Sequence, residues 1–340
     1  MSADPPIGVE AIAMTMRFGD FAALDNVELK VRPGSFHALL GENGAGKSTL
    51  VKCIMGYYRP TEGAVLIGGR ERAVSNPKDA HALGLGMVYQ HFTLVPAMTV
   101  AENLVLARDH LPAVVDWTKE RDELAFFLSK MPFQVPLNAK VADISAGERQ
   151  KCEILKQLYL KRRFLILDEP TSVLTPGEAD EVLGMLRDMV KAGDLTVLMI
   201  THKFREVMAF ADEVTILRRG RLAGRGKVGE LTPDDMARMM IGAEQLTVQP
   251  ARTGEAGLIR LELDKILARD DAGGVAVNGL SLTVRAGEIV GIAGVSGNGQ
   301  RQLVEVLAGQ READSGAIRV SGETYHAARE EMRRHKMSLL

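Results

Sequence analysis

An internal repeat constrains this sequence more than any other feature. Residues 24–69 align with residues 277–322 without a gap, at a constant offset of 253 positions. Because glycine marks places where the backbone turns or approaches another segment closely, matched glycines indicate matched folds. Five pairs recur at this offset: Gly41 and Gly294, Gly44 and Gly297, Gly46 and Gly299, Gly56 and Gly309, and Gly63 and Gly316. We interpret the repeat as a duplicated folding unit.

Both copies have the same predicted order of elements. A strand (27–31 in the first copy, 280–284 in the second) leads to a glycine turn, an apolar strand, a glycine-rich loop and a helix. Residues 7–243 are expected to form the first unit, and residues 258–340 the opening part of a second. Residues 244–257 are polar, contain one proline and two glycines, and are predicted to be a linker. Most of the second unit is expected to be missing.

Composition excludes several classes of protein. Of the 340 residues, 46% are hydrophobic and 25% are charged, which is typical of a globular protein rather than a disordered or fibrous one. With 42 basic and 44 acidic side chains the net charge is −2, so no nucleic-acid partner is expected. Two cysteines are too few for a disulfide framework. No apolar run reaches the roughly 18 residues of a membrane span, and the first residues do not form a signal peptide.

The first glycine-rich loop has the pattern of a phosphate-binding loop. The strand 37–40 leads into Gly41-Glu42-Asn43-Gly44-Ala45-Gly46-Lys47-Ser48-Thr49, and the apolar residues after it have helical spacing. A strand, G-x-x-x-x-G-K-S and a helix are the context of a P-loop, in which backbone N–H groups and the helix N-terminus bind the β-phosphate. In such a site Lys47 reaches the β- and γ-phosphates, and Ser48 binds Mg²⁺.

The second glycine-rich loop departs from this pattern at the two side chains that carry the chemistry. Gln300 stands in the place of Lys47, and Arg301 in the place of Ser48. An amide does not supply the charge of the lysine, and a guanidinium repels Mg²⁺ rather than binding it. Nucleotide binding through backbone groups stays open at this loop, but hydrolysis is not expected there.

Two acids follow another apolar strand. The run 164–167 ends in Asp168 and Glu169, a pattern typical of a strand buried on both faces of a parallel sheet, with a ligand at its carboxyl edge. Asp168 is expected to hold Mg²⁺ through water, and Glu169 to orient and polarise the attacking water. The segment 175–178 then predicts a helix start, with Thr175 as N-cap and Glu178 at the third helical position.

Two more polar residues follow strands of the same kind. His202 comes after the apolar strand 196–200, and Gln90 comes after the strand 85–89. A single histidine of this sort is more often structural than catalytic. Beside the other motifs, His202 is predicted to reach a γ-phosphate, and Gln90 to contact Mg²⁺ and the attacking water.

A serine and a glutamate open the helix that precedes the acidic strand. The segment Ser145-Ala146-Gly147-Glu148 has the S-x-x-E pattern of a capping box. The other interpretation is that this helix N-terminus faces a γ-phosphate, as helix N-termini do. The residues alone do not decide between the two.

Taken in order, these motifs resemble the ATP-binding cassette (ABC) family over nearly the whole first unit. The resemblance implies the α/β fold of a P-loop NTPase, with a mainly parallel core sheet, an N-terminal antiparallel β-subdomain and a helical subdomain, followed here by a partial second cassette. It makes 145–148 the family's signature segment and Phe18 the aromatic that stacks on the adenine of ATP. Ala146, Glu148 and Thr175 depart from the general pattern of the family, and we interpret them as branch features.

The resemblance narrows to the ATPase subunit of bacterial simple-sugar and nucleoside importers, which have tandem cassettes and a second loop without lysine. Segments 90–96 and 169–175 favour the nucleoside branch. The resemblance implies an ATP hydrolase at the cytoplasmic face of the inner membrane. It places contact with integral-membrane permease subunits in the segment after Gln90 and implies an extracytoplasmic solute-binding protein as an indirect partner. ATP is expected between the P-loop of one cassette and the signature of a second, in cis or in trans.

Several alternatives have identifiable signatures in sequence. Within the family, the alternative is an importer of ribose- or galactose-type sugars. A soluble, non-transport ATPase of translation has a long charged linker and an intact second loop, and a DNA-repair cassette has a long insertion between P-loop and signature. Here 98 positions separate Lys47 from Ser145, without a cysteine cluster. Because no second signature precedes Leu340, we expect slow hydrolysis by this chain alone unless two copies pair their first cassettes.

Overall fold

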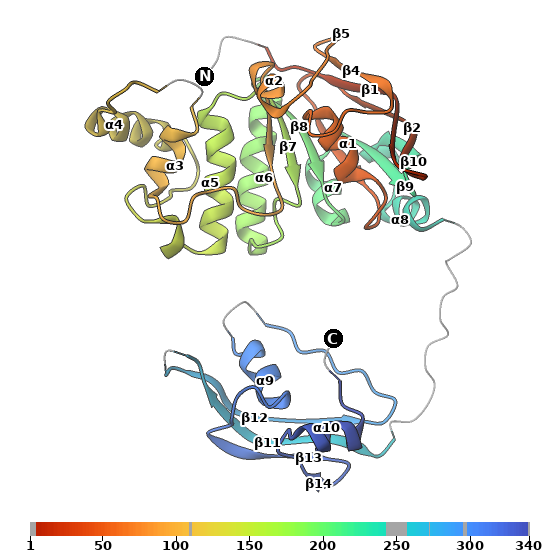
Figure 1. Cartoon of the computed structure of the whole chain (residues 1–340), viewed down its shortest axis with the longest axis vertical. Helices are drawn as coiled ribbons and strands as arrows, with labels where there is room; N and C mark the ends of the chain where they lie inside the picture. Colours follow the sequence, from red (N-terminus) through yellow and green to blue (C-terminus); the bar gives the residue numbers. More distant parts are fainter. Residues whose placement is uncertain (1–4, 109–110, 243–256, 272, 295–297, 339–340) are drawn as a thin grey trace. The chain divides into compact units, whose positions relative to one another are not determined.

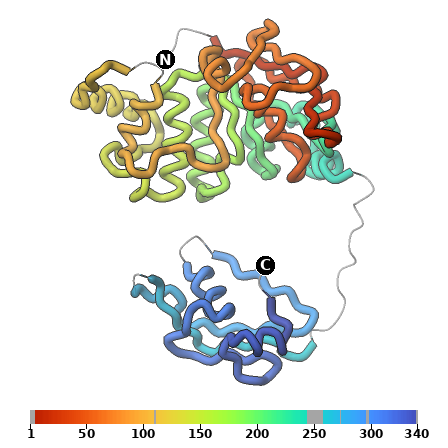
Figure 2. The backbone as a smooth tube through the Cα atoms, in the orientation of Figure 1, coloured from red at the N-terminus to blue at the C-terminus, as the bar shows by residue number. Residues whose placement is uncertain are grey.

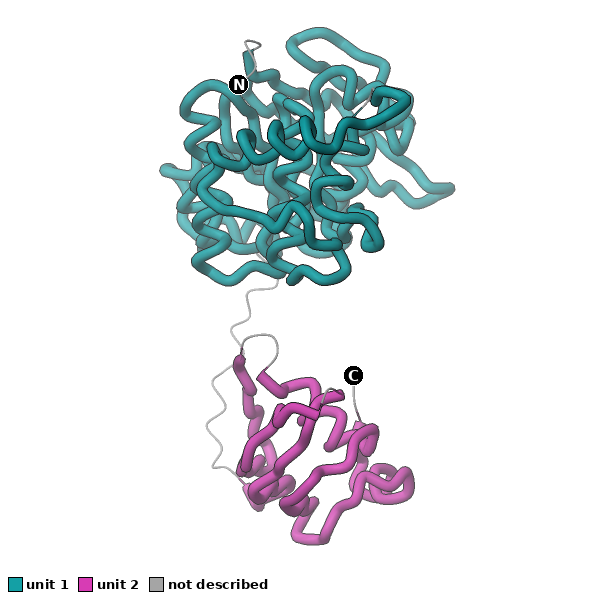
Figure 3. Tube along the Cα trace, turned by 90° about the vertical axis from the view of Figure 1, so that its left-hand side faces the viewer, with its two compact units in different colours: residues 1–247 teal, residues 248–340 magenta. Residues whose placement is uncertain are grey.

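The computed structural model describes residues 5–108, 111–242, 257–271, 273–294 and 298–338 (Figure 1). The chain divides into two compact units, residues 1–247 and 248–340 (Figure 3). The first unit contains two sheets and several hydrophobic cores, and the second contains one sheet with its own core. The predicted linker, residues 244–257, lies outside the described residues except for Gly257.

A six-stranded sheet forms the centre of the first unit, in the order β10-β9-β3-β8-β7-β6. The strands β9, β3, β8, β7 and β6 are parallel, and β10 pairs antiparallel with β9. The strands predicted from apolar runs are confirmed to within a residue. The bounds are β3 Phe36–Leu40, β6 Leu85–Val88, β7 Phe164–Asp168, β8 Thr196–Ile200, β9 Glu213–Arg218 and β10 Arg221–Lys227.

Both faces of this sheet are buried, which explains its continuous apolar runs. Successive side chains of a strand point to opposite faces. In β7, Leu165 and Leu167 therefore pack with helices in one core, while Phe164 and Ile166 belong to a second core on the other face. A sheet covered on both sides needs apolar residues at every position rather than at every second one.

An antiparallel sheet contributes to the second of these cores. Its strand order is β2-β1-β4-β5, and β1 carries irregularities in its pairing with both neighbours. The bounds are β1 Val9–Phe18, β2 Phe21–Val31, β4 Glu62–Ile67 and β5 Arg70–Glu71. Its inward side chains pack with those of α1 (Lys47–Ile54) and of β3, β7 and β8. This sheet is the antiparallel β-subdomain expected from the sequence.

The remaining helices of the first unit complete its layers. Helices α3 (Val100–Leu106) and α4 (Trp117–Leu128) lie beside α5 (Ala146–Tyr159) at the end of the unit away from β1 and β2, where they form the helical part (Figures 1 and 2). Helix α6 begins after Thr175, whose side chain forms the predicted capping box with Glu178. The other elements are α2 Pro77–Ala82, η1 Val141–Asp143, α6 Pro176–Lys191, α7 Phe204–Phe210, η2 Val228–Glu230 and α8 Pro233–Ile241.

The second unit repeats the antiparallel sheet and the loop-to-helix step of the first. Its strand order is β12-β11-β13-β14, which matches β2-β1-β4-β5. The helix predicted after the second glycine-rich loop is confirmed as α9, and its apolar side chains pack on the sheet. The bounds are β11 Ile259–Arg269, β12 Val275–Arg285, α9 Gln300–Leu307, β13 Ser315–Val320, β14 Glu323–Thr324 and α10 Arg329–His335.

One predicted strand of the second unit is wrong. The apolar run 289–293, the counterpart of β3, forms no strand, and Ile289 is 89% exposed. In the first unit β3 pairs with β8 and β9. At the repeat's offset, the counterparts of these partners fall beyond residue 340. A strand needs neighbours for its backbone hydrogen bonds, so the apolar sequence alone does not form one.

Asp212 ties three elements of the first unit together. Its carboxylate accepts hydrogen bonds from both terminal nitrogens of Arg187 in α6, at 2.7 and 2.6 Å, and from the backbone N–H of Phe36 in β3, at 2.8 Å. Burial by itself raises the pKa of Asp212, but the hydrogen bonds from Arg187 and Phe36 outweigh it and lower the pKa below the ordinary value. The ionised form therefore stabilises the fold.

We predict that Asp212→Ala lowers the free energy of unfolding by about 2 kcal/mol at neutral pH, because it removes charge-assisted hydrogen bonds to Arg187 and Phe36. The pKa of Asp212 is depressed in the folded state, so its contribution is present above the unfolded pKa and is lost as pH falls through the folded pKa. Urea unfolding at several pH values measures this. Asp188→Ala, an exposed site on α6, is the matched control. A difference that does not shrink toward acid pH would contradict the prediction.

Candidate functional site

The predicted phosphate loop connects the carboxyl end of β3 to helix α1. Gly41, Gly44 and Gly46 have φ values of 154°, 80° and 102°. At Gly41 a Cβ atom would lie 2.5 Å from the carbonyl oxygen of Leu217, and at Gly46 one would lie 2.9 Å from that of Ala23. The loop therefore combines left-handed backbone with close packing, and glycine meets both requirements.

A cavity of about 300 Å³ lies against this loop. Phe18 lies at the end of β1, is 46% exposed, and contacts Tyr58 edge-on with 5.4 Å between the ring centroids. The structure thus brings the predicted adenine-stacking residue and the loop to one cavity. Its lining consists of Phe18, Phe21, Ala23, Asn43, Gly44, Ala45, Gly46, Lys47, Ser48 and Thr49.

Lys47 folds back over the loop. Its Nζ donates hydrogen bonds to the carbonyl oxygens of Gly41 at 2.7 Å and Glu42 at 2.9 Å. Burial lowers the pKa of Lys47, while the charges of Glu169 and Asp168 raise it. The lysine therefore lies within electrostatic reach of the acidic pair.

The acidic pair and His202 meet at the carboxyl edge of the central sheet. Strands β7 and β8 are parallel and in register, with Asp168 opposite Ile200. Glu169 has φ of 49°, and its N–H donates to the carbonyl of Ile200 at 2.9 Å. Its Oε1 lies 3.0 Å from Nδ1 of His202. An ionised carboxylate only accepts, so Nδ1 of His202 carries the proton of this hydrogen bond.

Asp168 is a half-buried carboxylate beside the phosphate loop. Burial and the neighbouring charge of Glu169 raise its pKa, and Lys47, Lys52 and His91 lower it. Across the described residues, no hydrogen bond or ion pair to its side chain is found. This carboxylate is therefore free to accept a ligand.

Gln90 follows β6 at the same edge of the sheet. Strand β6 is parallel to β7, with Val88 opposite Leu167, so the segments after the two strands leave the sheet side by side. The Gln90 side chain is exposed, and within the described part of the chain it makes no hydrogen bond. The pairing brings Gln90 to the edge that holds Asp168, and among the described residues no hydrogen bond joins the two side chains.

The predicted signature segment lies apart from the loop cavity. Ser145 caps α5: its Oγ accepts from the N–H of Glu148 at 3.2 Å, and the Glu148 carboxylate accepts from the N–H of Ser145 at 2.8 Å. The capping box is therefore formed. Ser145 and Ala146 are exposed, and none of the residues 145–148 lines the cavity.

The second glycine-rich loop differs at the corresponding places. Helix α9 begins at Gln300, directly after Gly299 with φ of 87°. The counterpart of Phe18 is Asp271, whose carboxylate pairs with Arg311 at 2.6 Å and offers no ring for stacking. Residues 295–297 of the predicted loop lie outside the described residues.

Glu153 is a buried residue of the site region that sequence reasoning missed. It lies on α5, and its side chain is 1% exposed. Its carboxylate accepts hydrogen bonds from the N–H of Thr93, from the N–H of Leu94 at 3.0 Å and from the Thr93 hydroxyl at 2.9 Å. Lys156 neutralises it at 2.7 Å. The segment just after Gln90 is thereby fixed to the helix that begins with the signature.

Asn103 holds the same segment from α3. It is buried, and its side chain bonds both the N–H of Val95 at 2.7 Å and the carbonyl of Val95 at 3.1 Å. It also donates to the carbonyl of Thr99, whose hydroxyl forms a capping box with Glu102. Residues 93–103 are therefore one hydrogen-bonded unit resting on α5. The capping box at Thr99 and Glu102 is a local motif, whereas the attachment of the segment to α5 through Glu153 has no local signal in the sequence.

The central sheet, the phosphate loop, the antiparallel sheet and the helical part together define an ATP-binding cassette fold. A solved nucleotide-free ATP-binding cassette from an ABC transporter has this fold, with a TM-score of 0.61 and 24% identity over 69% of this chain and 99% of that one. The chain belongs to the ABC transporter family, whose model matches residues 24–172 and 277–340.

Three curated proteins are similar to this chain over most of its length. The nucleoside import ATP-binding protein NupA of Lactococcus lactis is 40% identical over 92% of the chain, and the guanosine import ATP-binding protein NupO of Bacillus subtilis is 41% identical over 93%. A ribose import ATP-binding protein of Rubrobacter xylanophilus is 39% identical over 94%. The chain spans 62–63% of the length of these relatives.

We predict that Glu153→Ala speeds amide hydrogen exchange at Thr93 and Leu94 by about tenfold or more, because both N–H groups lose their acceptor. Glu153→Gln keeps one acceptor oxygen and is expected to have a smaller effect. Exchange measured by NMR on the full chain tests this. Asp122→Ala, an exposed acid in α4, serves as control. Unchanged protection of both amides in Glu153→Ala would refute the assignment.

Proposed function

We propose that the first unit binds and hydrolyses ATP as the energising subunit of an importer. The observation that carries this proposal is the meeting of three elements at one sheet edge: the loop with Lys47, the acids Asp168 and Glu169, and His202. Phosphate binding, charge compensation and water activation each need one of these elements. The ATP-binding relatives support the proposal.

ATP binding is assigned to the cavity along the phosphate loop. The adenine stacks on Phe18, and the phosphates lie over residues 41–49 at the N-terminus of α1, where unpaired N–H groups attract anions. Lys47 exchanges its two carbonyl acceptors for phosphate oxygens, which is a favourable charge-assisted replacement. The segment 145–148, in which Ser145 and Ala146 are exposed, contacts ATP held by another cassette, in cis or in trans.

The residues at this edge fit a magnesium ion. Ser48, Gln90 and Asp168 offer hydroxyl, amide and carboxylate oxygens, which are the ligands that Mg²⁺ prefers. Asp168 has no other partner within the described residues, and burial, together with the charge of Glu169, raises its pKa. When bound, Mg²⁺ would supply charge neutralisation at the β- and γ-phosphates.

Glu169 is proposed as the residue that orients and polarises the attacking water. The left-handed backbone at Glu169 and the hydrogen bond from its N–H to the carbonyl of Ile200 fix the backbone position from which the side chain extends. The hydrogen bond from His202 fixes its direction. With its proton on Nδ1, His202 donates to one oxygen of Glu169, and the other oxygen remains available to accept a hydrogen bond from water.

The proposed partners are integral-membrane permease subunits. Among the described residues, no helix has the length and apolar character to cross a bilayer. The segment 93–103 is the proposed contact, since it is rigidly held and exposes Val95 at 45%. The proposed location is peripheral, at the cytoplasmic face of the inner membrane, and a solute-binding protein acts indirectly through the permease.

Nucleosides are the proposed class of transported solute. Segments 90–96 and 169–175 favour that branch, and the names of NupA and NupO agree with it. Ribose-type sugars are the second candidate, which the ribose relative favours. Uptake of labelled nucleoside and labelled ribose into vesicles containing the permease and this subunit distinguishes the two classes.

We predict that Glu169→Gln retains ATP binding and lowers steady-state hydrolysis about 10²-fold or more, because an amide cannot accept the proton of the attacking water. Binding is measured by calorimetry and turnover by phosphate release. Glu71→Gln, which changes an exposed carboxylate in β5, is the control. Turnover equal to that of the unmodified protein would remove Glu169 from this role.

We also predict that Lys47→Ala weakens ATP binding about tenfold or more, since one charge-assisted contact to the phosphates is lost. Equilibrium binding of a fluorescent ATP analogue measures the change. Lys78→Ala, an exposed lysine of α2, is the matched control. Equal affinities in the two variants would place the phosphates elsewhere.

A further inference from the structure

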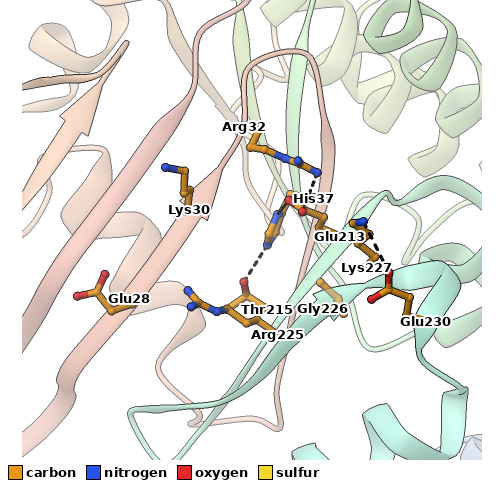
Figure 4. Close-up of a pocket in the computed structure, with 11 residues that line it drawn as sticks. Glu28, Lys30, Arg32, His37, Glu213, Thr215, Arg225, Gly226, Lys227 and Glu230 are labelled. Carbon is orange, nitrogen blue, oxygen red and sulfur yellow. Dashed lines mark hydrogen bonds and ion pairs between the residues drawn. The ribbon is translucent and has the colours of Figure 1, made fainter.

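A second cavity of the first unit, of about 460 Å³, lies away from the nucleotide site. It lies between β2 on one side and β9 and β10 on the other, with His37 of β3 among its lining residues (Figure 4). No residue lines both this cavity and the one at the phosphate loop. The lining contains four cationic side chains (Lys30, Arg32, Arg225, Lys227) and three carboxylates (Glu28, Glu213, Glu230).

His37 is a buried polar residue with one unsatisfied nitrogen. The residue is 3% exposed, and its Nε2 lies 2.8 Å from the hydroxyl of Thr215. Its Nδ1 is buried without a hydrogen-bond partner, and Oε2 of Glu213 lies 3.8 Å from it. A carboxylate repels a bare lone pair, so the proton is favoured on Nδ1 and Nε2 accepts from Thr215. Nδ1–H is then a donor that lacks an acceptor.

Burial keeps this imidazole neutral. It lowers the pKa of His37 to about 4, with a smaller contribution in the same direction from Arg32, whereas Asp212 raises it. At neutral pH the ring therefore does not contribute a positive charge to the cavity. Its Nδ1–H can therefore donate one more hydrogen bond if an acceptor comes within reach.

Of the two guanidinium groups that line the cavity, one has a carboxylate partner and the other has none among the described residues. Arg32 pairs with Glu213 at 2.7 Å, whereas Arg225 has no ion pair or hydrogen bond within the described ranges. Lys30 pairs with Glu10 at 3.0 Å, and Lys227 pairs with Glu230 at 3.6 Å. Figure 4 shows the Lys30 and Arg225 side chains on one side of His37 and the Arg32 guanidinium on the other, beside Glu213.

We propose that this cavity binds a small phosphate-bearing anion at Arg225, with Arg32 turning from Glu213 to reach it. Guanidinium groups bind phosphate oxygens through two parallel hydrogen bonds, and Lys30 adds a third positive charge nearby. A phosphate has enough oxygens to accept hydrogen bonds from both guanidinium groups at once. A carboxylate has only two oxygens and is less suited to bind both groups.

Binding proceeds by an exchange of partners. The anion takes Arg32 from Glu213, and the released Glu213 carboxylate accepts the hydrogen bond of His37 Nδ1–H, 3.8 Å away in the present arrangement. The exchange removes the unsatisfied donor and leaves no carboxylate without a partner. No covalent step is involved, and the site does not depend on the proposed ATP hydrolysis.

The test observes His37 itself, because phosphate also has a predicted site at the loop 41–49. The imidazole nitrogens of the full chain, labelled with ¹⁵N in histidine, are followed by NMR at neutral pH and constant ionic strength. The His37 signals are assigned with His37→Asn. Inorganic phosphate is titrated in one arm, and ribose 5-phosphate in the other. Arg225→Gln is compared with Arg221→Gln, which changes an arginine of the same strand that lies outside the cavity.

We expect the His37 Nδ1 signal to shift saturably, with an affinity about tenfold weaker in Arg225→Gln and unchanged in Arg221→Gln. Saturation by inorganic phosphate identifies the free ion as sufficient, and saturation by ribose 5-phosphate alone identifies a larger phosphate ester. A His37 signal that does not move in either arm overturns the proposal. So does a shift of equal affinity in Arg225→Gln, or one that sodium chloride reproduces.

Discussion

The parallel, in-register pairing of β3, β8, β7 and β6 is the constraint on which the rest of the first unit depends. Parallel strands end at the same edge, so each segment that leaves the sheet there is a neighbour of the next. The pairing of Asp168 with Ile200 is what places Glu169 within hydrogen-bond distance of His202, 33 positions further along the chain. The same pairing buries both faces of the sheet and so requires the apolar runs that surround these polar residues. Fold and site are consequences of one set of backbone hydrogen bonds.

Features that depend on neighbouring residues were predictable from the sequence. The runs 164–167 and 196–200 are strands, Thr175 and Ser145 are helix caps, and the glycine-rich loop joins a strand to a helix. Features that depend on distant partners were not. The run 289–293 is as apolar as β3, yet it forms no strand. Strand β3 is hydrogen-bonded to β8 and β9, and an apolar sequence does not by itself provide such partner strands. The sequence of strands predicts that Glu169 and His202 lie at the same sheet edge. Their hydrogen bond depends in addition on the register between β7 and β8, which the sequence does not give.

Glu153 shows the same limit within the site. In the sequence it is one polar residue in a helix with an apolar stripe, where a solvent-exposed position is the ordinary expectation. In the structure it is buried, because its four acceptor sites meet two backbone N–H groups and the hydroxyl of a segment 60 residues earlier, together with Lys156. A carboxylate is tolerated there only because all of these donors are present. Helix α5 thus carries both the exposed cap at Ser145 and the anchor of residues 93–103.

The repeat provides an internal comparison for the cavity at His37. At the offset that matches the glycines of the two phosphate loops, His37 corresponds to Val290, Lys30 to Thr283 and Glu28 to Ser281. Val290 follows the turn at Gly287 as His37 follows the turn at Gly34, but Val290 lies outside any strand. The turn and loop shared by the two copies therefore do not call for an imidazole at this position. In the first copy the ring lies beside Glu213 of β9 and near Arg32, whose counterpart in the second copy is Arg285. The histidine therefore differs between the copies although the neighbouring arginine does not, and in the first copy it faces a carboxylate that β9 supplies.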